Sequence, residues 1–209
     1  ILAPTDFSEK SAYAVRAAAL LAREQGAPLV CMHVIEELDE GSAWLLLVET
    51  PDEIEQQLRE ARMERLQEFC GRQIEGLFAV DAVEYRIEVG SPTDEVLFVA
   101  DELDASMVVV GTLGHSRILA AFLGSTANQL IRQSERPVLI VPPDKIFEGV
   151  RKILAPVDFS EVSRASLDRA VEMARAGGGE VYLLHAMGTP PAGVGDPNFP
   201  VYLGPGTVE

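Results

Sequence analysis

The stretch ILAPTDFSEKSAYAVRAAALLAREQGAPLVCMHVI, residues 1–35, decides the fold class, and the chain contains it twice. It aligns without a gap to ILAPVDFSEVSRASLDRAVEMARAGGGEVYLLHAM, residues 153–187. Each copy has the pattern of an apolar strand that ends at a proline, a helix capped by Ser8 or Ser160, a glycine that ends the helix, and a second apolar strand. A match of this length indicates a duplicated strand–helix–strand unit.

The first copy is followed by further helix-start signals that alternate with strand patterns. TPDE (residues 50–53) opens a long helix to about Glu75, and SPTD (residues 91–94) opens another before EVLFVADEL. AVEYRIEV, SMVVVG and PVLIV have strand patterns, and STANQLIRQS has the pattern of a helix before the last strand. This alternation predicts the α/β class, with a doubly wound, open five-stranded parallel sheet in residues 1–143.

The second copy is followed by a segment rich in proline and glycine, GTPPAGVGDPNFPVYLGPGTVE, at residues 188–209. A single strand–helix–strand unit buries too little surface to form a domain. We therefore expect one domain at residues 1–143, a linker at 144–149, and an incomplete second domain of the same kind at 150–209.

The composition of the 209 residues, 47% hydrophobic and 24% charged, is that of an ordinary globular protein. A formal net charge of -16 without a basic stripe argues against a nucleic-acid partner. Apolar runs are shorter than the ~20 residues of a membrane-spanning helix, and the first residues lack a secretion signal, so we expect a cytoplasmic protein. Cys31 and Cys70 have neither the spacing of metal ligands nor other candidate ligands beside them in the sequence. This predicts inert thiols that are buried or half-buried.

A ligand crevice is expected beside the first strand. Open parallel sheets bind ligands beyond the carboxyl ends of their strands, where the winding direction reverses. In the strand order 3-2-1-4-5, which we favour, strands 1 and 4 flank that point. Asp6 follows strand 1 and Gly111 follows strand 4, so two separate sequence features are expected at one crevice.

The segment VVVGTLGHSRILAAFLGSTANQ, residues 108–129, has a spacing of glycines that suits a phosphate group. Gly111, Gly114 and Gly124 allow backbone N–H groups to approach a ligand closely, and residues 125–126 begin a helix whose N–H groups favour an anion. From the glycines alone, structural use in turns and caps is an equal alternative. Asp6 alone reads more readily as a turn or cap residue.

Together these residues resemble the universal stress protein family. Its pattern G-x2-G-x9-G-[S/T] is met by Gly111, Gly114, Gly124 and Ser125, and its P-x-D-x-S start is met by residues 4–8. The resemblance covers residues 1–143, and residues 150–187 look like the first third of a second family domain. It implies the adenine nucleotide alpha hydrolase-like fold with strand order 3-2-1-4-5, and a tandem protein of the subgroup that binds ATP.

The resemblance also implies which residues meet the nucleotide. Asp6 would meet the adenine, with Pro4, Thr5 and the backbone near Val34 beside it. The remaining residues would line the ribose and hold the phosphates: Val110, Gly111, Leu113, Gly114, His115, Gly124, Ser125 and Thr126. Many family members carry His and a basic residue where this chain has Leu113 and His115. Loss of a permanent cation weakens triphosphate binding, so ADP or AMP is an alternative to ATP, and Mg²⁺ is a further candidate cofactor.

Family members pair through the last strand, here residues 138–141, which implies a tandem pseudo-dimer within the chain and a homodimer between chains. Pro156 and Asp158 could belong to a second nucleotide site, but no second glycine loop is present in the sequence. His33 and His185 occupy the same place in both copies. This match indicates a structural or adenine-side position rather than a metal site, because no second ligand has suitable spacing.

Catalysis has little support in the sequence, which lacks a nucleophile elbow, a paired-carboxylate pattern and a Walker lysine. The leading hypothesis is an ATP-binding, nucleotide-dependent regulator in a stress response rather than a fast catalyst. One alternative is a slow ATPase or phosphotransferase that uses the same site, and another is an interaction module without a nucleotide. AWLLLVE, residues 43–49 with Trp44, is expected in the core or between domains, with contact to a partner as the alternative.

Overall fold

The computed structural model describes residues 1–36, 51–79, 82–112, 124–143 and 147–186. The expectations for Trp44 and its neighbours lie outside these ranges. The chain divides into two compact units, Ile1–Val150 and Arg151–Glu209. Among the helices of the described ranges, none combines the length and the apolar character needed to cross a membrane.

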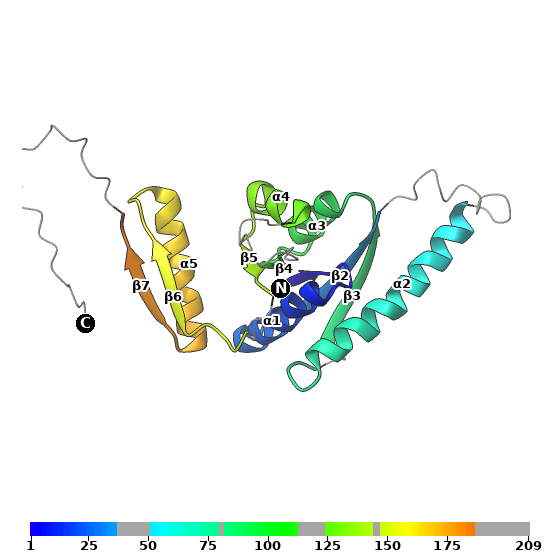
Figure 1. Ribbon diagram of the computed structural model, residues 1–209, viewed down its shortest axis with the longest axis horizontal. Coiled ribbons are helices and arrows are strands. Elements are labelled where there is room, and N and C mark those ends of the chain that lie inside the picture. Colours follow the sequence, from blue (N-terminus) through cyan, green and yellow to red (C-terminus); the bar gives the residue numbers. More distant parts are fainter. Residues whose placement is uncertain (37–50, 80–81, 113–123, 144–146, 187–209) are drawn as a thin grey trace, which may run out of the picture. The chain divides into compact units, whose positions relative to one another are not determined.

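The first unit is an open parallel sheet of five strands in the order β3-β2-β1-β4-β5 (Figure 1). The strands are β1 (Leu2–Pro4), β2 (Leu29–Ile35), β3 (Val83–Val89), β4 (Val108–Gly111) and β5 (Val138–Val141). The helices are α1 (Glu9–Gln25), α2 (Pro51–Ile74), α3 (Pro92–Glu102) and α4 (Ser125–Gln133). Both the α/β class and the strand order predicted from the sequence are confirmed.

Two apolar layers hold the helices against the sheet. One layer lies between the strands and the pair α3 and α4, and its buried residues include Leu2, Val30, Met32, Val96, Val99, Val108, Val110 and Leu130. Side chains alternate between the faces of a strand, so Ala3, Cys31 and Val109 face the other side, where α1 and α2 pack. The sheet is therefore covered on both faces, and its carboxyl edge is where a ligand can approach.

Local sequence accounts for the ends of α1. The hydroxyl of Ser8 accepts a hydrogen bond from the backbone N–H of Ser11 at 3.2 Å, which satisfies one free N–H of the first turn. Gly26 ends the helix in the left-handed region, at φ 61°. Between these caps, the buried face of the helix is mostly alanine, so the helix backbone can approach the sheet closely.

The second unit repeats this local structure. It contains β6 (Lys152–Pro156), α5 (Glu161–Gly177) and β7 (Glu180–Leu184), with β6 and β7 paired in parallel. Leu154 and Leu184 are 62% and 49% exposed, whereas their counterparts Leu2 and Met32 are fully buried. In the described part of this unit, the strand–helix–strand structure is repeated, but the apolar layer that buries Leu2 and Met32 in the first unit has no counterpart. That residues 150–209 are part of a second domain stays a prediction.

Two details were not predicted from the sequence. Ser91 begins α3 as predicted, but its side chain makes no capping hydrogen bond. Both cysteines are buried, in agreement with the prediction of inert thiols, but the two residues, far apart in the sequence, are neighbours whose thiols share a hydrogen bond. That bond, together with burial, raises the pKa of Cys31 well above its ordinary value, which disfavours the reactive thiolate.

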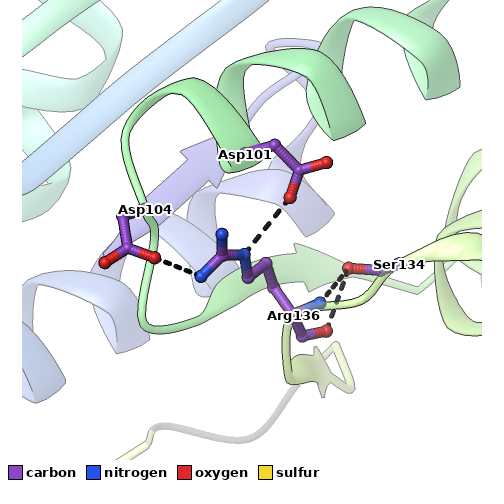
Figure 2. Close-up of polar contacts among 4 residues, drawn as sticks. All are labelled: Asp101, Asp104, Ser134 and Arg136. Carbon is purple, nitrogen blue, oxygen red and sulfur yellow. Dashed lines mark hydrogen bonds and ion pairs between the residues drawn. The ribbon is translucent and has the colours of Figure 1, made fainter.

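Arg136, just before β5, ties the start of that strand to the end of α3 (Figure 2). Its Nε donates to Asp101 at 3.2 Å, and its Nη1 donates to Asp104. The hydroxyl of Ser134 accepts from the backbone N–H of Arg136 at 3.0 Å and donates to its carbonyl at 2.9 Å. These contacts link the segment before β5 to the end of α3, while β5 itself pairs with β4, the strand that carries Gly111.

Candidate functional site

A cleft of about 310 Å³ opens at the carboxyl ends of β1 and β4. Every predicted site residue that the structure describes lines it: Pro4, Thr5, Asp6, Val34, Val110, Gly111, Gly124, Ser125 and Thr126. The remaining predicted residues, Leu113, Gly114 and His115, lie outside the described ranges. The structure therefore brings together segments that are far apart in the sequence, while their contact with a nucleotide stays a prediction.

His33, for which the sequence indicates a structural or adenine-side position, also lines the cleft. Several further lining residues were not predicted as site residues from the sequence: Ser8, Lys10, Ser11, Glu36, Pro92, Val96, Thr112 and Ala127. Lys10 and Ser11 could have been found, because the first turn of α1 follows β1 directly at the crevice. Pro92 and Val96 begin α3, and only the assembled layers show that this helix reaches the cleft. Lys10 adds a cationic residue to the lining, and Glu36 adds an anionic one.

The loop at residues 5–8 connects β1 to α1 and presents Asp6. Asp6 accepts a hydrogen bond from the backbone N–H of Ser8 at 2.9 Å. The hydroxyl of Thr5 accepts from the backbone N–H of Phe7 at 3.0 Å and shares a hydrogen bond of 2.8 Å with the hydroxyl of Ser11. These short contacts hold the loop as a turn, so Asp6 has a turn role and lines the cleft as well.

The carboxylate of Asp6 stays ionised near neutral pH. Burial alone would raise its pKa, but hydrogen bonds from Ser8 and Ser11 favour the charged form more strongly, and the pKa is lowered from 3.8. An ionised carboxylate accepts hydrogen bonds and donates none, so it suits an amino group or a hydroxyl group of a ligand.

Phe7 has a left-handed backbone, with φ 62°, which costs a residue other than glycine about 1–3 kcal/mol. Its ring lies 4.1 Å from the ring of His33 and 5.7 Å from that of Phe69, measured between centroids. The guanidinium carbon of Arg65 lies 4.4 Å from the same ring centroid. Aromatic and cation–π contacts of this kind offset the backbone cost.

His33 bonds the backbone of the same loop. Its Nδ1 lies 2.8 Å from the carbonyl oxygen of Thr5, and a carbonyl only accepts, so Nδ1 carries the proton and donates. Burial lowers the pKa of His33, and the charges of Arg62 and Arg65 lower it further. The Thr5 carbonyl and the charge of Asp6 act in the opposite direction without reversing the shift. The ring is therefore neutral at pH 7.

We expect the stability of the first unit to fall as the pH drops below 6.5, the ordinary pKa of histidine. A lowered pKa in the folded state means that the unfolded chain binds the proton first, so stability is complete above 6.5 and is lost down to the folded pKa. Proton NMR titration should place the pKa of His33 below 6.5, and H33N should remove this part of the pH dependence. A pKa at or above 6.5 would contradict the prediction.

The other side of the described cleft is the start of α4. Gly124 is its N-cap and makes no side-chain capping bond, and the first turn contains no acidic residue. The first N–H groups of a helix have no partner within it and carry partial positive charge. With Ser125 and Thr126 beside them, these N–H groups suit an anion such as phosphate.

Gly111 allows the end of β4 to approach α1. A Cβ atom at this position would lie 2.8 Å from the carbonyl oxygen of Lys10 and 3.3 Å from the backbone nitrogen of Ser11. The glycine is therefore required for packing as well as for the lining of the cleft. Within the described ranges, no group of three or more His, Cys, Asp or Glu side chains is placed to hold a metal ion.

Comparisons with known proteins agree on one family. A family model described as the universal stress protein family matches residues 1–142 and 149–201. Universal stress protein G of Shigella flexneri is 34% identical over 148 residues, which cover 68% of this chain and 96% of that relative. Universal stress protein E of Salmonella typhi is 37% identical over 68 residues, which cover 32% of this chain and only 22% of that relative.

A solved structure of a relative holds a nucleotide. It is a crystal structure of a universal stress protein in complex with cAMP, 27% identical to this chain, with a TM-score of 0.51. The match covers 67% of this chain and 94% of that chain.

Proposed function

We propose that this chain, which belongs to the universal stress protein family, binds an adenine nucleotide in the cleft between β1 and β4. It would act as a nucleotide-dependent regulator in a stress response. One observation carries the proposal: the loop that presents Asp6 and the N-terminus of α4 line the same cleft, whose volume of about 310 Å³ suits a small ligand.

The two sides of the cleft suit the two ends of a nucleotide. Asp6, with Pro4, Thr5 and Val34 beside it, would accept a hydrogen bond from the amino group of adenine. Gly111 and residues 124–126, at the opposite side with Val110, would hold ribose and phosphates. A relative crystallised with cAMP supports an adenine nucleotide as the ligand. By family resemblance, Leu113, Gly114 and His115 would complete the phosphate side.

Charge in the lining favours one orientation of the nucleotide. Asp6 and Glu36 repel phosphate, whereas Lys10 and the N–H groups at the start of α4 attract it. The phosphates would therefore lie toward α4. ATP is the proposed ligand, with ADP or AMP as alternatives, and Mg²⁺ would bind together with the phosphates.

A slow ATPase or phosphotransferase is the second candidate function. Asp6 is a weak base because its pKa is lowered, and the Nδ1–H of His33 is engaged with Thr5. Glu36 is a further carboxylate in the lining. These contacts favour binding over fast hydrolysis, and a regulator additionally needs a ligand that distinguishes two conformations.

The proposal is tested by denaturing freshly purified protein and identifying any nucleotide released. ATP, ADP and AMP are then titrated by calorimetry, with GMP as a control for the base. Added ATP should raise the melting temperature, because a ligand that binds only the folded state stabilises it, and the rise should grow with the ATP concentration. G124V should remove this rise. Release of no nucleotide, together with no thermal shift, would overturn the proposal. Phosphate release well above a protein-free control, lost in G124V, would favour the enzyme.

Pairing of domains through β5 also belongs to the proposal. In the described sheet β5 is an edge strand, and an edge strand offers N–H and C=O groups to a partner. We propose a homodimer, or a tandem pseudo-dimer within the chain, that uses Val138–Val141. Sedimentation velocity at several concentrations distinguishes a dimer from a monomer. The absence of a nucleic-acid partner and a cytoplasmic location stay predictions from composition.

A further inference from the structure

We propose that Phe7 and His33 are positioning residues for the nucleotide, because together they hold residues 5–8 in the conformation that presents Asp6 to the cleft. This inference rests on the proposed function and adds two residues to it. Neither residue needs to touch the nucleotide, since both act through the backbone on either side of Asp6.

The contacts involve the residue before Asp6 and the residue after it. Before Asp6, His33 donates from Nδ1 to the Thr5 carbonyl at 2.8 Å. After Asp6, the ring of Phe7 packs on the ring of His33 at 4.1 Å while the Phe7 backbone is left-handed. One histidine on β2 therefore fixes both neighbours of Asp6. The direction in which the carboxylate leaves the backbone is set by these two neighbours.

The second unit contains the same set of contacts in a different environment. His185 Nδ1 lies 2.7 Å from the carbonyl oxygen of Val157, and its ring lies 4.5 Å from that of Phe159, whose φ is 65°. Asp158 again accepts from the backbone N–H of the following serine, Ser160, at 3.0 Å.

This repeat shows which contacts the loop needs. Phe159 is 80% exposed, yet its backbone is as left-handed as that of Phe7. The residue before the aspartate is Val157 in place of Thr5, so the hydroxyl contacts of Thr5 are not required either. Both copies share the histidine–carbonyl hydrogen bond, the ring contact and the aspartate turn, together with the serine cap of the helix and a backbone hydrogen bond from the residue before the aspartate to the second strand. The histidine and the phenylalanine are thus among the shared partners of the loop.

In the first unit, α2 adds two further contacts to the Phe7 ring. The guanidinium of Arg65 lies over the ring, and the ring of Phe69 meets it edge-on. The stacking on His33 does not depend on them, as the second unit shows. The loop is therefore positioned chiefly from β2, and the contribution of α2 is secondary.

The test uses the full chain and three variants: H33A, H33N and F7G. H33A loses the donor to Thr5 and the ring, and we expect about tenfold weaker binding of AMP and ATP by calorimetry. H33N keeps an N–H donor near the position of Nδ1 but loses the ring contact with Phe7, so its affinity should lie between those of H33A and wild type. F7G accepts the left-handed backbone freely but loses the ring, so its affinity should fall about tenfold without an equal loss of melting temperature.

H185A and F159G in the second unit are matched controls, and both should bind nucleotide at the first cleft as wild type does. A second readout needs no ligand: amide hydrogen exchange at Ser8, by NMR, should be faster in H33A and F7G than in wild type, and slower in H33N than in H33A. Equal affinity of wild type and H33A, or unchanged exchange at Ser8, overturns the inference. A wild-type protein that binds no adenine nucleotide overturns the proposed function instead, and the exchange at Ser8 then still decides whether these residues hold the loop.

Discussion

Replacing Gly111 by alanine is expected to weaken nucleotide binding by roughly two orders of magnitude and to destabilise the first unit. The added Cβ would lie 2.8 Å from the carbonyl oxygen of Lys10 and 3.0 Å from its carbonyl carbon, and both are backbone atoms that cannot rotate away. The end of β4 and the start of α1 must then separate. Overpacking of this kind costs about 1–3 kcal/mol. A displacement of about 1 Å lowers the efficiency of a preorganised site by roughly two orders of magnitude, and we expect the nucleotide affinity to fall by a similar factor.

The matched control for this variant is G71A. Gly71 lies within α2, and a Cβ atom there would meet nothing within 4 Å. Alanine in a helix interior is favoured over glycine by about 0.5–1 kcal/mol, so this variant should be as stable as wild type or more stable. Calorimetric titration and urea unfolding measure both effects. A G111A protein that binds ATP as wild type does would show that the approach of β4 to α1 does not shape the cleft.

Truncation of Leu130 to alanine is expected to give the largest loss of stability, about 2–5 kcal/mol. The side chain is fully buried in the layer between α4 and the sheet, where Val108, Val110 and Val138 from β4 and β5 also lie. Removing it leaves a cavity beneath the helix whose N-terminus lines the cleft. Nucleotide affinity should fall as well, because α4 is then held less firmly.

The neighbouring residue offers the control. Ile131 is 46% exposed on the same helix, so I131A changes the composition of α4 by a similar amount without opening a cavity. Its cost should be within about 0.5–1 kcal/mol. Urea unfolding followed by circular dichroism compares the two variants. Equal losses for both would contradict the assignment of Leu130 to the core.

The fold could be predicted because its signals are local and repeated. The duplicated segment at residues 1–35 contains both strands, the cap at Ser8 and the glycine that ends α1, and each depends on neighbours in the sequence. The strand order follows from general rules for parallel sheets together with the family resemblance. The caps at Ser8 and Ser160 appear in the structure as predicted.

The contacts that shape the site could be predicted only in part. The bond from His33 to Thr5 joins residues far apart in the sequence, and the approach of Cys31 to Cys70 depends on how α2 lies on β2. Nothing in the local preferences of phenylalanine indicates a left-handed backbone at Phe7, since such residues avoid it. A signal did exist: a phenylalanine and a histidine recur at the same places in both copies.

The shape of the loop at residues 5–8 has a consequence for the speed of binding. Both copies of the loop hold the same conformation although their surroundings differ, so contacts within each unit set the order around Asp6. Under the proposed function, a nucleotide would meet a loop that its own contacts already order, so little conformational entropy would be lost on this side of the cleft. Related nucleotides should therefore reach the site at similar rates, and the lifetime of each complex will decide which of them occupies it.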